Sequence, residues 1–159
     1  MIIFPFPKEY NFKEEYYTLP ERPSILCPSK KVLRYISEFM CSEPSQGDAD
    51  IKFELDEALK KEEYKITMSE NDIIIRGGDE EALFRGAQTL KQIVLQEENG
   101  KVQCINISDK PDIERRGIML DVSRGRIQKP AEIKRLIDIM ADMKYNELQL
   151  YFDKIVYEY

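Results

Sequence analysis

Residues 117–152 read GIMLDVSRGRIQKPAEIKRLIDIMADMKYNELQLYF, and this stretch decides the fold of the second half of the chain. Residues 117–122 are almost continuously apolar, which is typical of a strand buried on both faces in a parallel sheet. Pro130 suits the first turn of a helix. The helix that follows would have an apolar stripe of Ile133, Leu136, Ile137, Met140 and Met143. Because a second apolar strand is expected at Leu148–Phe152, the stretch predicts one βαβ unit.

A single βαβ unit does not form a complete fold. A two-stranded parallel sheet with a single helix leaves one face and both edges uncovered. We therefore expect either that its strands extend another sheet, or that the unit opens a larger α/β fold.

The residues upstream predict a different architecture, an α+β domain with a mainly antiparallel sheet and helices packed against it. A helix is expected after Ser29, strands at Ile51–Leu55 and near Val102–Ile107, a hairpin from Tyr64 to Ile75 around Ser69-Glu70-Asn71, and a helix from Asp79 to about Leu95. A polar joint at Asp109–Asp112 ends this region. The predicted domains are therefore 1–108 and 109–159.

Composition excludes several classes of protein. The 159 residues include 30 acids and 24 bases, for a net charge of -6, and no histidine. Without histidine, this chain alone cannot build a His-based triad, an imidazole general base or a His-ligated metal site. The acidic balance argues against nucleic acid or an anionic membrane as a partner. No segment reaches the roughly 18 uninterrupted apolar residues of a spanning helix.

The number and spacing of the cysteines indicate the cellular compartment of the protein. Cys27, Cys41 and Cys104 are far apart and show no metal-binding spacing, so they fit reduced thiols better than disulfides or a zinc site. The N-terminal residues carry no basic start and no small-residue cleavage site, and are not expected to be a signal peptide. We expect a cytoplasmic protein without a metal or other cofactor.

Carboxylates are the first candidates for chemistry. The adjacent pairs Glu14-Glu15, Glu62-Glu63, Glu80-Glu81 and Glu97-Glu98 are expected to be solvated surface charges. Asp121 differs, because it interrupts an apolar strand near the carboxyl end, where α/β folds place ligands. Four arginines flank that strand, namely Arg115, Arg116, Arg124 and Arg126. The residues alone leave both structural ion pairing and ligand contact open for this cluster.

Two motifs carry a resemblance to a known family. Residues 109–152 contain D-x-P, then R-G-x-M-L-D-x-S-R, a helix, and K-x-N-x-L-x-L, while residues 83–90 contain L-F-R-G-x-Q-T-L. In this order and spacing they resemble glycoside hydrolase family 20, the β-N-acetylhexosaminidases, over about residues 50–155. The resemblance implies a non-catalytic α+β domain followed by the opening of a (β/α)8 barrel.

The resemblance also implies an activity. The family removes terminal N-acetylhexosamine with retention, using the acetamido oxygen of the sugar as nucleophile and an Asp-Glu pair on the fourth barrel strand. That pair is expected beyond Tyr159, so this chain would contain no catalytic residue and be inactive alone. The family pattern assigns Arg116 to the hydroxyls of the terminal sugar.

The same pattern makes Asp121, Ser123 and Arg124 site-supporting residues. Gln149 and Tyr151 stand where many members carry histidine.

The alternative function is a stand-alone protein-interaction or structural module, in which the βαβ unit packs back on the sheet.

Overall fold

The computed structural model describes residues 1–124 and 127–153. It divides into two compact units, Met1–Pro111 and Asp112–Tyr159. The division falls inside the proline-containing joint at Asp109–Asp112.

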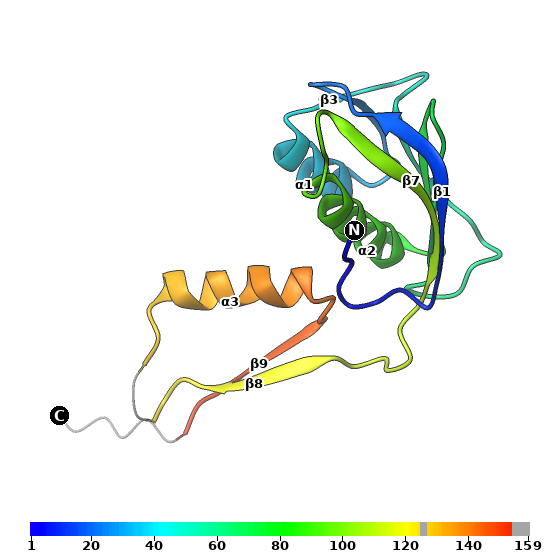
Figure 1. Ribbon diagram of the computed structural model, residues 1–159. Helices are drawn as coiled ribbons and strands as arrows, with labels where there is room; N and C mark the ends of the chain where they lie inside the picture. The colour runs from blue at the N-terminus through cyan, green and yellow to red at the C-terminus, as the bar shows by residue number, and fades with distance from the viewer. Residues whose placement is uncertain (125–126, 154–159) are drawn as a thin grey trace. The chain divides into compact units, whose positions relative to one another are not determined.

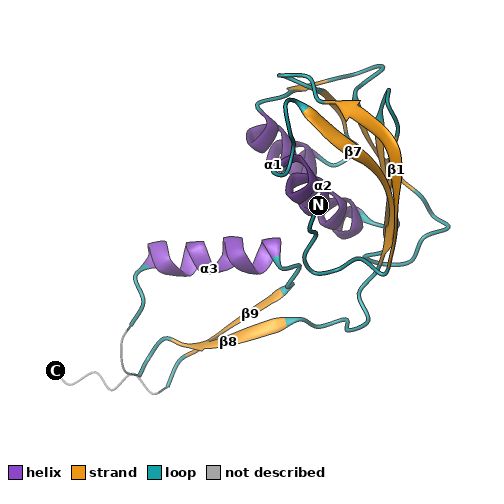
Figure 2. Ribbon diagram, in the orientation of Figure 1, coloured by secondary structure: helices purple, strands orange, loops and turns teal. Residues whose placement is uncertain are grey.

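The first unit is one mixed sheet with two helices, which confirms the predicted α+β class (Figures 1 and 2). Its elements are β1 (Glu9–Thr18), β2 (Ser24–Leu26), α1 (Lys30–Met40), β3 (Glu43–Pro44), β4 (Ile51–Leu55), β5 (Tyr64–Met68), β6 (Ile73–Gly77), α2 (Glu80–Val94) and β7 (Lys101–Asp109). The strand order is β1-β7-β5-β6-β4-β2-β3. The pairings from β1 through β7 and β5 to β6 are antiparallel, while β6-β4, β4-β2 and β2-β3 are parallel.

Side-chain caps explain where the helices begin. The Ser29 hydroxyl accepts a hydrogen bond from the backbone N–H of Val32, and the Asp79 carboxylate accepts one from Ala82 at 2.7 Å. Each cap satisfies an otherwise unpaired N–H of a first turn. Ser29 also donates to Glu80 at the start of α2, at 2.5 Å. The two helix starts are therefore tied together.

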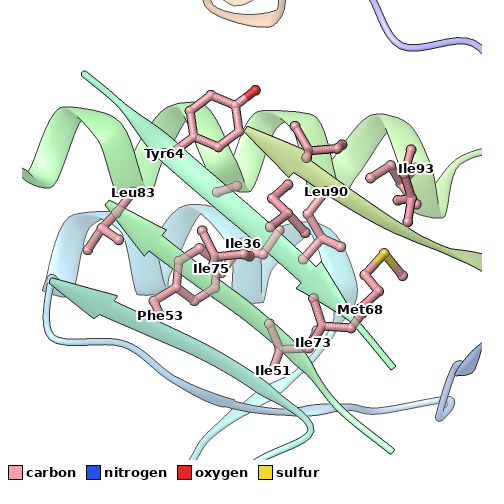
Figure 3. Packing of buried hydrophobic residues seen from close by; sticks show 14 of the residues in the cluster. Ile36, Ile51, Phe53, Tyr64, Met68, Ile73, Ile75, Leu83, Leu90 and Ile93 are labelled. Atoms are coloured by element: carbon pink, nitrogen blue, oxygen red, sulfur yellow. The ribbon is translucent and has the colours of Figure 1, made fainter. Parts of the chain in front are cut away.

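The core lies between the helices and one face of the sheet (Figure 3). Strand residues Ile51, Phe53, Tyr64, Met68, Ile73 and Ile75 pack there with helix residues Ile36, Leu83, Leu90 and Ile93. Helix α2 approaches the sheet closely at Gly86, where a Cβ atom would lie 2.5 Å from Cγ2 of Ile75. Glycine allows this close approach, because the Cβ of any other residue would collide with the buried Ile75 side chain.

The second unit is the predicted βαβ. Its elements are β8 (Gly117–Asp121), α3 (Pro130–Asp142) and β9 (Glu147–Tyr151), with Pro130 in the first turn of the helix. The strands pair in parallel, in a register that puts Gly117 beside Glu147 and Asp121 beside Tyr151. The strand-helix-strand order, and the parallel pairing that it requires, are thus confirmed.

The two faces of the β8-β9 sheet differ in burial. Ile118, Leu120 and Leu148 are partly buried, whereas on the opposite face Met119 is 64% exposed and Gln149 is exposed as well. The sequence predicted burial of β8 on both faces, and this expectation is wrong for the chain as it stands. Nothing among the described residues covers the face of Met119, so the unit has the open face expected of an unfinished α/β fold.

Candidate functional site

The polar cluster of the second unit lies at the carboxyl end of β8 and is built around Asp121. Its Oδ1 atom accepts hydrogen bonds from the backbone N–H and the hydroxyl of Ser123, both at 2.9 Å, and from the backbone N–H of Arg124 at 3.1 Å. Its Oδ2 atom accepts one from Arg124 Nε at 2.7 Å. The Ser123 donors, and then Arg124, hold the pKa of the Asp121 carboxyl well below its usual range.

The cluster also joins the ends of the two strands. Val122 donates its backbone N–H to the carbonyl of Tyr151 at 3.0 Å, and Asp153 donates its own to the Ser123 hydroxyl oxygen at 2.7 Å. The Arg124 guanidinium lies over the Tyr151 ring, 5.4 Å from its centroid, with Nε 3.7 Å from Asp153 Oδ2. Residues from β8 and β9 therefore meet at the edge where α/β folds bind ligands.

The chemistry open to this cluster is binding rather than proton transfer. Within the described residues the Asp121 carboxylate accepts hydrogen bonds only from Ser123 and Arg124, and its lowered pKa favours the ionised form, so it is unsuited to act as a general acid. The Arg124 side chain is 63% exposed, and within the described residues only its Nε makes hydrogen bonds. Its two terminal amino groups can therefore donate to two neighbouring oxygens of a ligand.

Arg116 lies at the other end of the same strand. Its Nε donates to the carbonyl of Lys144 at 2.9 Å and its Nη1 to those of Ile113 and Glu114, at 2.7 and 3.2 Å. Its backbone N–H donates to Asn146 Oδ1 at 2.9 Å. These contacts hold together the segment that enters β8 and the turn that enters β9. The sugar-binding role of Arg116 stays a prediction.

Of the two roles left open for the arginine cluster, ion pairing is what the structure shows at Asp121, and its partner is Arg124. Arg126 lies outside the described residues. The contact of Tyr151 with Arg124 was not predicted, and neither was the presence of Asp153 in the cluster. The signal that could have found Tyr151 is the register of a parallel pair, because the last residues of neighbouring parallel strands lie side by side.

The L-F-R-G-x-Q-T-L motif on α2 forms a buried polar network. Arg85 Nε lies 3.2 Å from Glu62 Oε2, and the two side chains are 7% and 5% exposed. Arg85 also donates to Gln88 at 3.2 Å, while the Thr89 and Tyr64 hydroxyls are 2.8 Å apart. The motif is thus explained by packing and internal pairing.

The expectation that Glu62-Glu63 is a solvated pair is wrong for Glu62, because this carboxylate neutralises a buried guanidinium. The pairs Glu14-Glu15, Glu80-Glu81 and Glu97-Glu98 are exposed, as predicted.

Residues 1–124 and 127–153 show no sign of a metal site or of a membrane-spanning helix. No group of three or more His, Cys, Asp or Glu side chains there is arranged to hold a metal ion. No helix in that part of the chain is long and apolar enough to cross a membrane. All three cysteines are free thiols, with Cys104 buried and Cys41 exposed.

Comparison with family profiles gives two consecutive matches. Residues 1–110 match glycosyl hydrolase family 20, domain 2, and residues 114–154 match the family 20 catalytic domain. The chain is 26% identical over 168 residues to a β-hexosaminidase of Porphyromonas gingivalis, covering 91% of this chain and 21% of that protein. It is 36% identical over 92 residues to one of Arthroderma benhamiae, covering 55% of this chain and 15% of that protein.

Solved structures agree with these matches. A β-N-acetylhexosaminidase of Streptomyces coelicolor superposes with a TM-score of 0.82 at 26% identity, over 94% of this chain and 34% of that one. An enzyme of the same name from Bacteroides fragilis shares the fold with a TM-score of 0.84 at 24% identity, over 94% of this chain and 32% of its own. The chain thus spans about a third or less of the proteins that it matches.

Proposed function

The chain belongs to glycosyl hydrolase family 20, and on this basis we propose that it works as part of a β-hexosaminidase that removes terminal N-acetylhexosamine from glycosides. Residues 1–110 correspond to the non-catalytic domain 2, and residues 114–154 to the start of the catalytic domain. The observation that carries the proposal is that these two matches are consecutive, and that the second falls on a βαβ unit with a polar cluster at its ligand-binding end.

The contribution of this chain to catalysis would be sugar binding by Arg124. Its guanidinium stands at the carboxyl end of β8, and its terminal amino groups make no hydrogen bond with the described residues, an arrangement that suits two neighbouring sugar hydroxyls. Arg116 is the weaker candidate for this role, because its guanidinium already donates to three backbone carbonyls at the amino end of the strand. The carboxyl end is where barrel enzymes assemble their sites.

Hydrolysis itself would need residues that this chain does not supply. The βαβ unit contains two strands, whereas a (β/α)8 barrel has eight. The reaction inferred for the family requires a carboxylic acid that donates a proton, and the hydrogen bonds at Asp121 keep that group ionised. We therefore expect the general acid and the orienting aspartate to come from the rest of the barrel.

The test is a hydrolysis assay with p-nitrophenyl N-acetyl-β-D-glucosaminide. The complete product of the gene that encodes this chain should release p-nitrophenol, and the purified 159-residue chain should not. An inactive but folded complete product would count against the proposal. So would activity of the chain alone that survives purification controls.

An interaction module is the second candidate, favoured by the apolar side chains that the second unit leaves exposed. Met119 is 64% and Phe152 is 61% exposed, and β8 and β9 each pair on one edge only among the described residues. Exposed apolar faces and open strand edges promote association. A stable dimer of the chain in sedimentation velocity, with the β8 and β9 amides protected from exchange, would support this candidate if the complete product is also inactive.

We further propose a cytoplasmic location, which the three free thiols support. Cell fractionation with an antibody against residues 1–110 tests it, and recovery in the secreted fraction would overturn it.

A further inference from the structure

We propose that Asp121 is a positioning residue, which acts on a bound sugar through Arg124 and does not touch the sugar itself. The inference rests on the proposed function, because it concerns how the sugar-binding guanidinium is held. It also explains why a charged residue stands at the end of an otherwise apolar strand.

The Asp121 carboxylate is itself held in place by hydrogen bonds. Three donors from the following turn converge on Oδ1, two from Ser123 and one from the backbone of Arg124. They set the orientation of the carboxylate plane, so that Oδ2 is left for a single partner. That partner is Arg124 Nε, at 2.7 Å, a short distance typical of a charge-assisted hydrogen bond.

Residues at the end of the neighbouring strand β9 also contact the Arg124 guanidinium. The Tyr151 ring lies 5.4 Å away and forms a cation-π contact, and the Asp153 carboxylate lies 3.7 Å from Nε. The Ser123 hydroxyl links the two strands, because it donates to Asp121 and accepts from the backbone N–H of Asp153. The direction of Arg124 therefore depends on both strands.

The consequence is preorganisation. An arginine on a flexible side chain must lose rotamer freedom when it binds a ligand, whereas one already fixed at Nε loses less. Neither the Nε bond nor the ring contact uses a hydrogen of the two terminal amino groups. Asp121 thus sets the direction of the donors without competing for the ligand.

The wild-type chain provides the first test, by NMR of the arginine Nε–Hε groups in the absence of any sugar. Arg135 is the internal control, because it lies on α3, is exposed, and its side chain makes no hydrogen bond or ion pair with the described residues. We expect Nε–Hε of Arg124 to exchange with water about tenfold more slowly than that of Arg135, as a charge-assisted hydrogen bond implies. Equal exchange rates would overturn the proposal.

Asp121→Asn provides the second test. The amide keeps one oxygen for the Ser123 and Arg124 donors, but its NH2 group cannot accept the Arg124 Nε–H. Exchange of Arg124 Nε–Hε should rise to the rate of Arg135, while the β8 backbone amides keep their chemical shifts. A purely structural role would move those backbone signals and not the side-chain signal selectively. Retained protection of Arg124 in a folded variant would overturn the proposal.

A matched control separates the effect from a loss of charge. Asp138→Asn removes a carboxylate from the exposed surface of α3, where the Asp138 side chain makes no hydrogen bond or ion pair with the described residues, and it should leave Arg124 exchange unchanged. An equal effect of this variant would contradict the specific contact with Asp121. If Asp121→Asn does not fold, the wild-type comparison with Arg135 still decides.

The positioning role and the proposed function fail separately. Addition of N-acetylglucosamine to the complete gene product should shift the Arg124 Nε–Hε signal. A protected Arg124 that does not respond to the sugar would contradict the proposed function and support the positioning role. An unprotected Arg124 that responds to the sugar would do the reverse.

Discussion

Glu62→Gln tests whether the family motif on α2 is stabilised by a buried ion pair. Glu62 Oε2 lies 3.2 Å from Arg85 Nε, with both side chains almost fully buried. Glutamine fills nearly the same volume, so the variant opens no cavity, but it leaves the guanidinium without this counterion. Breaking a buried pair costs about 3–5 kcal/mol, and the hydrogen bond that glutamine can still accept offsets part of that. We expect the free energy of unfolding to fall by about 2–4 kcal/mol.

Urea denaturation followed by far-UV circular dichroism measures this loss, and the absence of tryptophan makes that probe preferable to fluorescence. The control is Glu57→Gln, because Glu57 is exposed and makes no hydrogen bond or ion pair with the described residues. This variant should change stability by less than about 0.5 kcal/mol. If the two variants have the same denaturation midpoint, the buried pair does not contribute as argued.

Three further predictions follow from single contacts. Gly86→Ala should destabilise the first unit by about 1–3 kcal/mol in the same assay, because the clash with Ile75 outweighs the better helix propensity of alanine. A stabilised variant would contradict the close approach of α2 to the sheet. Arg116→Ala should lower the stability of the second unit by about 2 kcal/mol, because three hydrogen bonds are lost. The loss is measured as faster amide exchange in β8 and β9, and unchanged exchange would argue against a structural role of Arg116. The pKa of Asp121 is depressed in the folded state, so this carboxylate stabilises the second unit above the ordinary aspartate pKa of about 4, and the stabilisation is lost as pH falls towards the folded pKa. Protection of the β8 amides should therefore be constant from pH 7 to about 4.5 and decline below that. A decline near pH 6 would show that another group controls the stability.

Local signals were sufficient to predict most elements of the fold. The β5-β6 hairpin follows from strict alternation around a polar turn, and α2 from the cap at Asp79 with its apolar stripe. Strand β1 (Glu9–Thr18) was not predicted, because it lies at the edge of the sheet and buries only Tyr17. A strand with nearly every side chain exposed shows no alternation of apolar and polar residues.

Ion pairing at Asp121 was one of the two roles that the sequence left open, but its partner and geometry were not predicted. A carboxylate inside an apolar strand indicated an arginine partner, but the sequence could not choose between arginines at the two ends of β8. The pair of Glu62 and Arg85 was missed because the residues are 23 positions apart and meet only when α2 packs on the sheet. An arginine within the apolar stripe of a helix is the signal that could have indicated a buried acid.

The most direct test of the account compares Arg124→Ala with Arg116→Ala in the complete gene product, by kcat/KM for p-nitrophenyl N-acetyl-β-D-glucosaminide per folded molecule. If the carboxyl end of β8 binds the sugar, Arg124→Ala should lower kcat/KM about 30-fold or more, which corresponds to roughly 2 kcal/mol of lost transition-state binding, with little change in stability. Arg116→Ala should lower stability and leave kcat/KM of the folded fraction within about threefold. The opposite pattern, with catalysis lost at Arg116 and retained at Arg124, would contradict the account.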